Sequence, residues 1–402
     1  MPSGNKTKPA SPSPALTPRL MALLTVTMFA CSGTIHFQTP MLTSMGAEFG
    51  ADAAATGWVA TLSFAGFLAG TVFLVPLGDR FDKRKLFLAQ FSLTILALLV
   101  MAGAPSLAML AGASFLLGIG CSSASQNVIP MVAEMTHISN RGRTVGTLLT
   151  GLFTGILFAR VAGGFVAAGL GWRWMYVFSA ATLLLLLPVL YRHLPSSPAT
   201  TGLNYFALLR SIGALLREHA ALRRVAIIQL MLGMTYGGFW ATIATMLLQY
   251  HQFGPAQAGL MGIPGAAGIL IARPAGRWMD RRGVTPVVTT GICLVIAAYV
   301  SFAFAGSQVA AVVVGAILLD CGLRAAMVAN QTLINTIAPE ARSRSNTIFS
   351  ASVWGGNAVG AFVASMALAQ SGWLAVCGII VCAPVLALLV QWRSAGRAAE
   401  RH

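Results

Sequence analysis

The amino-acid sequence predicts an all-α membrane protein with twelve transmembrane helices, arranged as two pseudo-symmetric six-helix bundles. Three observations lead to this fold class. Of the 402 residues, 56% are hydrophobic and only 9% are charged, which is too little polar surface for a water-soluble globule of this size. Apolar stretches long enough to cross a bilayer recur along the chain, and short motifs recur at one fixed spacing. A soluble enzyme is therefore excluded.

Charge and cysteine content narrow the class further. The chain carries a formal net charge of +16, but its basic residues are spread through the gaps between apolar runs. A nucleic-acid-binding surface needs them gathered on one face, so we expect no nucleic-acid partner. The six cysteines fall inside or beside apolar stretches, without a CxxC pair or clustered histidines. We interpret them as small packing residues, and we expect no metal site and no cofactor.

The chain begins with a polar tail. Residues 1–18 are rich in Pro and Ser and lack apolar periodicity, so we expect them to be disordered. Six apolar runs occupy residues 19–192, six more occupy 223–393, and 394–402 form a second tail. The runs are too long and too uniformly apolar for barrel strands, so each is predicted to be a helix. They lie at about 20–41, 56–77, 84–102, 105–133, 142–168, 172–192, 224–250, 257–278, 285–305, 308–337, 344–370 and 372–392.

A linker, residues 193–222, separates the two sets of spans. It starts with the turn-rich stretch LPSSPATTG and continues with mixed apolar and charged residues. We expect an amphipathic helix at the membrane surface, with a plain solvated linker as the alternative. The apolar side chains that share one helical face are Leu208, Leu209, Ile212, Leu215 and Leu216.

Basic residues are distributed unequally between the two sets of loops. One side collects the lysines and arginines of both tails, of the loop after the second span and of the linker, whereas the other side has only Arg173. Lys and Arg resist translocation across a membrane. We therefore expect a multi-pass protein in which both termini and the linker are cytoplasmic.

Three short signatures occur twice. Asp79-Arg80 recurs as Asp280-Arg281, Arg141-x-Arg143 as Arg342-x-Arg344, and Gly171-Trp172 as Gly372-Trp373, each pair 201 residues apart. Each pair falls in the equivalent loop of a six-span set. The agreement predicts two related halves, with a substrate site between them near the middle of the bilayer.

The loop after the second span reads LGDRFDKRK at 77–85, and its counterpart reads GRWMDRRG at 276–283. At these residues the chain resembles the major facilitator superfamily, whose loop signature is G-x-L-a-D-R-x-G-R-K. The resemblance implies a latch at the cytoplasmic helix ends, where ion pairs and helix dipoles hold the two halves together. Its members by this resemblance are Asp79, Lys83, Glu134, Asp280 and Arg281.

The fifth span carries G-x8-G-x3-A-R-x2-G-G, from Gly146 to Gly164. It is similar to the G-x8-G-x3-G-P-x2-G-G pattern linked with antiporters of this superfamily, with Ala159 and Arg160 in place of Gly and Pro. Together with the stretches PLGDR, RGRTVG and GWRW, these residues resemble a bacterial subgroup of efflux carriers. The resemblance implies a monomer in a bacterial cytoplasmic (inner) membrane.

Charged residues inside the spans are costly and usually face a cavity or a partner. Arg160 lies near the middle of the fifth span, where it either binds an anionic substrate or responds to a proton, or is a structural residue bonded to helix carbonyls. Asp320 and Arg324 are four residues apart on the tenth span, so they share a face and can pair. Asp320 is the best candidate proton carrier in the chain, and a permanent ion pair is the alternative.

Other polar and aromatic residues of the spans are weaker candidates. His36 titrates near neutral pH as a free group, although a lone His on an apolar helix is more often a packing residue. Trp240 and Trp354 can stack on a substrate or simply pack, whereas Trp172, Trp174 and Trp373 at span ends suggest an interface belt. Uncharged hydrogen-bonding candidates, for each of which bonding between helices is the alternative, are Gln38, Gln126, Asn330, Gln331 and Asn357.

These features favour a secondary active transporter that moves a small organic molecule by alternating access. Resemblance to the subgroup implies proton-coupled efflux of drugs or metabolites. The alternative is uptake or facilitated transport of a small organic anion, which Arg160 and Arg324 favour. No Walker A pattern occurs, so we expect no ATP binding of that kind. No HExxH, GxSxG or paired intramembrane aspartates occur either, so we expect no enzyme. The expected partners are a small-molecule substrate, protons and the lipid bilayer.

Overall fold

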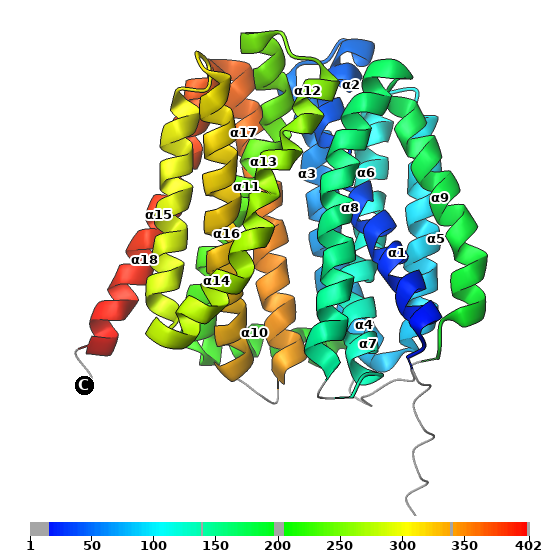
Figure 1. The fold of residues 1–402 in the computed structure, drawn as a ribbon, viewed down its shortest axis with the longest axis vertical. Coiled ribbons are helices and arrows are strands. Elements are labelled where there is room, and N and C mark those ends of the chain that lie inside the picture. Colours follow the sequence, from blue (N-terminus) through cyan, green and yellow to red (C-terminus); the bar gives the residue numbers. More distant parts are fainter. Residues whose placement is uncertain (1–15, 138–139, 197–204, 338–340, 400–402) are drawn as a thin grey trace, which may run out of the picture.

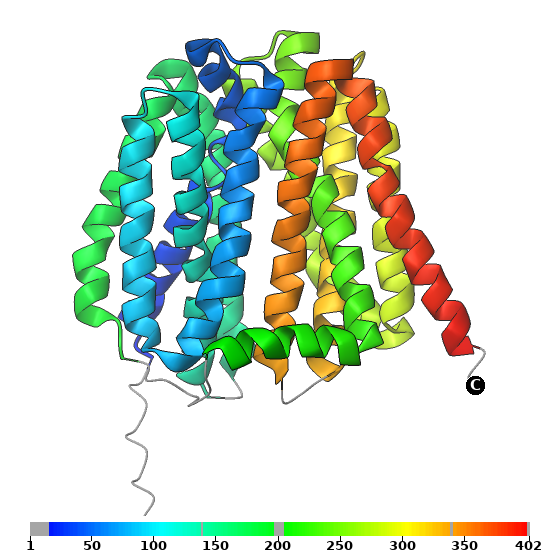
Figure 2. The ribbon, with the colours of Figure 1, turned by 180° about the vertical axis from the view of Figure 1, so that it is seen from behind.

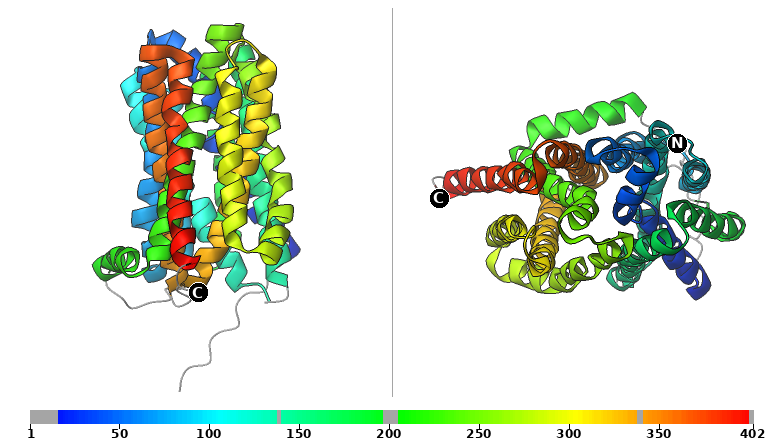
Figure 3. Two further views of the ribbon diagram at one scale, coloured as in Figure 1. Left: turned by 90° about the vertical axis from the view of Figure 1, so that its left-hand side faces the viewer. Right: turned by 90° about the horizontal axis from the view of Figure 1, so that it is seen from above.

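The structure, a computed structural model, describes residues 16–137, 140–196, 205–337 and 341–399. Every regular element in these ranges is a helix. Two groups of long, roughly parallel helices stand side by side, and the view from above separates them as two bundles (Figures 1 and 3). The prediction of an all-α membrane fold is confirmed.

The N-terminal half holds the first six spans. Two of them, α3 and α6, continue through short π-helical turns into α4 and α7, and the first span breaks after Thr34. That break corrects the expectation of one continuous helix over 20–41. The elements are α1 (Pro18–Thr34), η1 (Thr39–Met41), α2 (Leu42–Phe49), α3 (Ala53–Ala69), η2 (Gly70–Leu74), α4 (Val75–Arg80), α5 (Lys83–Ala102), α6 (Leu107–Ser123), η3 (Ala124–Val128), α7 (Ile129–Glu134), α8 (Arg141–Gly169) and α9 (Trp172–His193).

The C-terminal half repeats this plan. Its second span is divided into three short helices, and its fifth and sixth spans run together across a kink at Gly372. The linker helix is α10 (Tyr205–Glu218). The elements of the C-terminal half are α11 (Ala220–His251), α12 (Pro255–Leu260), α13 (Gly262–Gly265), α14 (Ala267–Arg282), α15 (Val284–Ala303), α16 (Val309–Ile337), α17 (Arg342–Ile380) and α18 (Cys382–Ala399). The last helix extends past the expected end of the twelfth span at about 392.

Ten helical stretches of the described chain are long and apolar enough to cross a membrane. The expected number of twelve follows once two local features are considered. The stretch Arg342–Arg393 contains both the eleventh and the twelfth span, because the kink at Gly372 does not end the helix assignment. The eighth span is missing from the ten because α12, α13 and α14 are each shorter than a bilayer crossing.

The internal repeat is visible in the backbone. Gly171 and Gly372 both have positive φ angles, 94° and 76°, at the turn into the last span of each half. The tryptophan that follows each glycine is buried, and its indole nitrogen donates a hydrogen bond. Trp172 bonds to Glu48 Oε2 and Trp373 to the Phe302 carbonyl. The expectation that these two tryptophans form an interface belt is therefore wrong.

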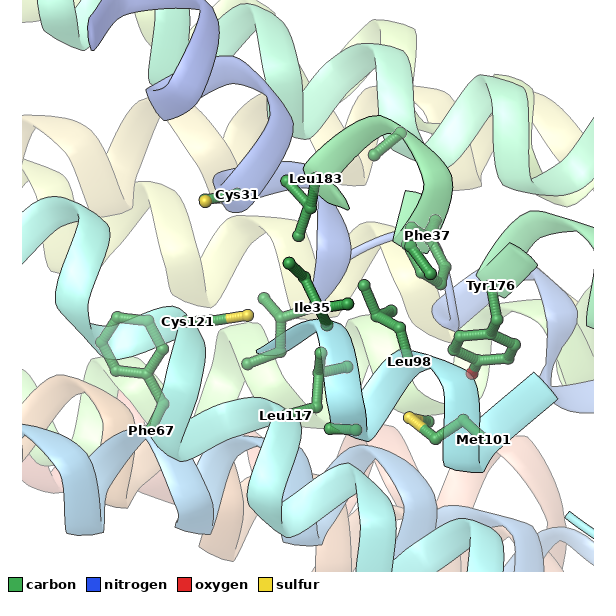
Figure 4. Packing of buried hydrophobic residues seen from close by; sticks show 14 of the residues in the cluster. Cys31, Ile35, Phe37, Phe67, Leu98, Met101, Leu117, Cys121, Tyr176 and Leu183 are labelled. Carbon is green, nitrogen blue, oxygen red and sulfur yellow. The ribbon is translucent and has the colours of Figure 1, made fainter. Parts of the chain in front are cut away.

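Each half has its own apolar core. In the N-terminal core, Ile35, Leu98, Leu117 and Tyr176 converge from α5, α6, α9 and the turn after α1, and Figure 4 shows them with two cysteines. The two cysteines, Cys31 and Cys121, are buried and free, like Cys377 in the other core. This is expected of packing residues. Cys293 and Cys382, in contrast, are exposed.

The halves meet mainly on two sides of the molecule. α3 packs on α17, where the Phe67 and Trp354 rings stack 3.8 Å apart. Trp354 is thereby engaged in packing between the halves. On the other side α8 packs against α12 and α13 rather than α14, with Gly164 against the Pro255 carbonyl and Gly259. On this second side the halves therefore meet mainly at the end of the bundle that carries α12.

The amphipathic helix α10 lies across the feet of both halves, at the end opposite α12 (Figure 2). Leu208 and Leu215 are buried, and Ile212 and Leu216 are partly buried against an apolar cluster of α11, α16 and α17. The Tyr205 hydroxyl donates to the Phe73 carbonyl of the N-terminal half. Residues 197–204, like 1–15 of the expected tail, lie outside the described residues.

The glycine turn yields a stability prediction. Gly171 holds a backbone conformation that is essentially restricted to glycine, so Gly171→Ala should lower the free energy of unfolding by about 1–3 kcal/mol. Gly169→Ala is the matched control, because Gly169 is helical and a β-carbon there meets open space. Thermal unfolding in detergent measures both, and equal melting temperatures would contradict the role assigned to Gly171.

Candidate functional site

Arg160 reaches from the N-terminal half into the C-terminal half. It lies in α8, and only 4% of it is exposed. Its Nη2 donates to the Tyr236 hydroxyl at 2.5 Å, and its guanidinium carbon lies 3.4 Å from the centre of the Trp240 ring. A desolvated cation–π contact contributes about 2 kcal/mol. These two residues of α11 therefore offset part of the cost of a charge buried at membrane depth.

Asp320 approaches the same place from α16. It is 3% exposed, and its Oδ2 has no hydrogen-bond partner among the described residues. A cavity of about 20 Å³, large enough for one water molecule, is lined by Asp320, Arg160 and Arg324. The Nε of Arg160 also has no partner within the described chain. Asp320 and Arg160, from different halves, thus line one small cavity, and each has one buried polar atom that no described residue bonds.

Arg324 does not pair with Asp320, although the sequence suggested that it can. No ion pair within 4.0 Å joins these two side chains in the part of the chain that is described. Arg324 extends toward α8, where its guanidinium carbon lies 4.6 Å from the centre of the Phe153 ring, and its Nη1 lies 3.9 Å from Met327 Sδ. Arg324 thus contacts the Phe153 ring of the N-terminal half instead of Asp320, the residue four positions before it on α16.

Glycines at every third position of the eighth span bring these charges together. A β-carbon at Gly262 would lie 3.2 Å from Arg160 Cβ, and one at Gly265 would lie 2.9 Å from Asp320 Oδ2. One at Gly268 would lie 2.7 Å from the Asp320 carbonyl. The broken helix α12–α14 is therefore thin where it passes between α8 and α16, because larger side chains would push the charged residues apart.

Two polar candidates of the first span, His36 and Gln38, have hydrogen-bond contacts within the N-terminal half. His36 is in the turn after α1, and its Nδ1 lies 2.9 Å from the Ser32 carbonyl. It interacts electrostatically with Arg160 and Arg324. Gln38 donates to Ser63 Oγ at 2.6 Å within the N-terminal half. His36 therefore lies beside the charged cluster. Gln38 joins the first two spans, and its Oε1 is buried without a partner among the described residues.

The remaining amide candidates differ in their surroundings. Gln126 donates to Ser350 Oγ at 3.1 Å and so joins the two halves. Asn357, with its amide oriented to satisfy both atoms, donates to the Gly233 carbonyl at 2.9 Å and thereby joins α17 to α11. Asn330 is buried, and its Nδ2 has no partner among the described residues. None of the three lines the cavity at Arg160 and Asp320.

The expected latch residues lie at the end that carries α10. Lys83 is buried at the start of α5, and Asp280 and Arg281 are exposed near the end of α14. The side chains of Asp79 and Glu134 lie outside what the structure describes. The latch therefore stays a prediction. Among the described residues, no group of three His, Cys, Asp or Glu side chains is placed to hold a metal ion.

Comparison with known proteins identifies the architecture. The model of the Major Facilitator Superfamily matches residues 22–225 and again 225–400, one match for each half. The chain belongs to the major facilitator superfamily. Members of this superfamily are transporters, so the expectation of a membrane transporter with a small-molecule substrate is confirmed at that level.

Similar major facilitators occur in several bacteria. An uncharacterized transporter, YgaY, of Escherichia coli O157:H7 is 31% identical over 383 residues, covering 95% of this chain and 97% of the relative. A probable transporter of Streptomyces coelicolor is 31% identical and covers 92% of this chain and 86% of its own. A multidrug resistance protein B homolog of Mycobacterium tuberculosis is 25% identical, covering 80% and 71%.

Solved structures share the fold of this major facilitator. The nucleoside transporter NupG superposes with a TM-score of 0.77 at 15% identity, covering 93% of this chain and 99% of its own. A bacterial homolog of the human lysosomal transporter Spinster gives 0.76 at 14%, covering 96% and 97%. The human organic anion transporter MFSD10 gives 0.67 at 16%, covering 94% and 100%. At these identities the likeness concerns the fold alone.

Two residues of the cluster, Tyr236 and Phe153, were not predicted from the sequence. Tyr236 precedes Trp240 by four residues and so shares its helix face, which was a usable signal. Phe153 precedes Arg160 by seven residues, two turns along the same face of α8. An apolar residue in an apolar span gives no signal of its own, so the contact of Phe153 with Arg324 required the structure.

The Arg160–Tyr236 contact can be measured directly. Tyr236→Phe should lower the free energy of unfolding by about 1.5–3 kcal/mol, because a buried guanidinium loses a hydrogen-bond acceptor. In an Arg160→Leu background the same substitution should cost little, which a double-mutant cycle on thermal unfolding will show. Equal losses in both backgrounds would mean that Tyr236 acts through packing alone.

Proposed function

We propose that this major facilitator is a proton-coupled secondary transporter in which Asp320 accepts the coupling proton. The observation that carries the proposal is the position of this carboxyl group. It is buried between the halves, with an unpartnered oxygen in a water-sized cavity beside Arg160. A carboxyl group in such a site changes the local charge by one unit when it binds a proton.

The charges also suggest how proton binding moves the halves. The ionised carboxyl of Asp320, on the C-terminal half, attracts Arg160 on the N-terminal half, and this attraction is strong because water is largely excluded. Protonation removes it. Since α8 meets the C-terminal half mainly at the end that carries α12, protonation should favour separation there, as alternating access requires.

We propose export of small organic molecules as the direction and substrate class. The support comes from sequence resemblance to efflux carriers and from the relative of Mycobacterium tuberculosis named as a multidrug resistance protein B homolog. Three aromatic side chains contact the arginines of the cluster, Trp240 and Tyr236 from α11 and Phe153 from α8. Aromatic rings around a site suit planar apolar molecules once the halves separate.

The proton role is tested in vesicles. Asp320→Asn should abolish the pH dependence of transport and leave the fold intact, because the amide cannot bind the proton. Proteoliposomes loaded with a pH-sensitive dye report proton movement when ethidium or a neutral lipophile is added. Asp52→Asn is the matched control, since Asp52 is an exposed helix cap that asparagine also provides. An unchanged pH profile in Asp320→Asn would remove Asp320 from coupling.

A second candidate, transport of a small organic anion, rests on a different observation. Two guanidinium groups, Arg160 and Arg324, line the cavity against one carboxyl group, so the site has an excess of positive charge. An anion that enters between the halves would find two charge-assisted hydrogen-bond donors. One neighbour in fold is named as an organic anion transporter.

A thermal-shift experiment separates the two candidates. If the substrate is an organic anion, benzoate should raise the melting temperature of the native protein and not that of Arg160→Gln, since a ligand stabilises only the state that binds it. Arg277→Gln, which removes an exposed arginine of α14, should keep the shift. A shift that survives in Arg160→Gln would argue against the anion site, and stabilisation of both proteins by ethidium would favour export of lipophilic compounds.

The loop cations indicate which end of the bundle faces the cytoplasm. We propose that the end with α10 is cytoplasmic in the bacterial inner membrane, because nearly all loop cations lie there, and that Asp79, Lys83, Glu134, Asp280 and Arg281 latch the halves at that end. Asp79→Asn should then raise the rate at which an impermeant maleimide labels a cysteine introduced at Ser350. Labelling as slow as in Asp52→Asn would count against the latch.

A further inference from the structure

A second hollow lies away from the interface between the halves. It is a groove of about 880 Å³ between α5 and α9, and these helices stand at the outer edge of the N-terminal half (Figure 1). On α5 it is lined by Lys85, Leu88, Ala89 and Ser92. These positions follow the i, i+3, i+4, i+7 spacing, so they form one stripe along the helix. Two small residues in this stripe keep the groove deep.

The stripe on α9 has the same spacing. Leu184, Leu187, Pro188 and Tyr191 line the opposite wall, followed by Arg192. Leu184 is 56% exposed and Tyr191 is 65% exposed, and in a membrane-embedded helix this surface faces lipid. The groove is thus an apolar channel on the outer surface of the bundle, with walls built from one face of each helix.

The charged residues are confined to one end of the groove. Lys85 and Arg192 both lie at the end of the bundle that carries α10, and both are exposed. No carboxylate lies within 4.0 Å of either side chain in the described part of the chain. The carboxylate of Asp82 caps α5 and accepts from Ser196. Among the residues that the structure describes, the two cations therefore have no anionic partner.

A third cation fixes the width of the groove. Arg84 donates to the Tyr191 carbonyl, and its guanidinium lies 5.6 Å from the centre of the Tyr191 ring. This contact ties the start of α5 to the end of α9. The two cations that line the groove are consequently held on opposite walls of a site that already exists without a ligand.

The shape and the charges fit an amphiphile with an anionic head. From Lys85 to Ser92 the groove extends about 10 Å along α5, so a chain that starts at the cations continues into the hydrocarbon region. A soluble anion would use the two cations and leave the apolar walls unused. Lys and Arg near the membrane surface attract anionic lipids, and basic pockets between transmembrane helices bind their head groups.

We propose that the groove between α5 and α9 binds an anionic phospholipid. Its phosphate lies between Lys85 and Arg192, and one acyl chain lies along Leu88, Leu184 and Leu187. The site is separate from the charged cluster at Arg160 and does not depend on the identity of the transported substrate. A lipid bound there contacts both α5 and α9, the third and sixth spans of the N-terminal half.

Native mass spectrometry of the delipidated, detergent-purified protein tests this site. The protein is titrated with phosphatidylglycerol and, separately, with phosphatidylcholine of the same chains. The native protein should prefer phosphatidylglycerol, and Lys85→Gln/Arg192→Gln should weaken its binding on the order of tenfold. Arg277→Gln/Arg282→Gln removes the same charge from exposed positions of α14 and should keep the preference.

A third variant separates the groove from surface charge. Ala89→Phe fills the groove and leaves both cations in place, so it should weaken the binding of both lipids. Equal affinity of the charge variant and its α14 control would overturn the proposal, as would an Ala89→Phe variant that binds both lipids normally. Displacement of bound phosphatidylglycerol by millimolar inorganic phosphate would also overturn it, because the site would then take a soluble anion.

Discussion

The guanidinium of Arg160 joins two halves that elsewhere meet mainly through apolar helices and glycines. A charge at this depth is tolerated only when protein groups replace its water, and here the replacing groups, Trp240 and Tyr236, belong to the other half. The glycines of α12–α14 permit the approach, and Asp320 closes the same space from α16. The position of one half relative to the other and the solvation of one charge are therefore linked, so that any change in the charge of the cluster acts on the interface between the halves.

The scaffold is repeated, but the cluster is not. The turns at Gly171 and Gly372 and the buried tryptophans that follow them occupy equivalent places in both halves. At the repeat spacing of 201 residues, Arg160 corresponds to Ala361 and Asp320 to Ile119. The residues that recur 201 positions apart thus lie at turns and at the starts of helices, where they determine the fold of each half. The charges of the cluster do not follow the repeat, because each half contributes a different group, Arg160 from one and Asp320 from the other.

Much of the fold was predictable from composition and periodicity. A bilayer requires long apolar helices, and such helices are visible in the sequence as long apolar runs. The divided eighth span and the break after Thr34 were not predictable, since both depend on how glycines and polar groups meet neighbouring helices. For the site, the rarity of charge inside the spans pointed to Arg160, Asp320 and Arg324, which the structure brings around one cavity. The partner of Arg324 was not predictable from the sequence, because the packing of the opposite half decides whether Arg324 meets a carboxyl group or the Phe153 ring.

In the proposed mechanism, the charge state of the cluster controls how the halves sit relative to each other. Double electron–electron resonance in a cysteine-free background measures this most directly, with spin-label pairs at Ala168 and Gln308 near the end opposite α10, and at Arg143 and Arg277 near α10. Lowering the pH should lengthen the first distance and shorten the second, and Asp320→Asn should show the low-pH distances at every pH. Distances that ignore pH in the native protein, or that still follow pH in Asp320→Asn, would contradict the account.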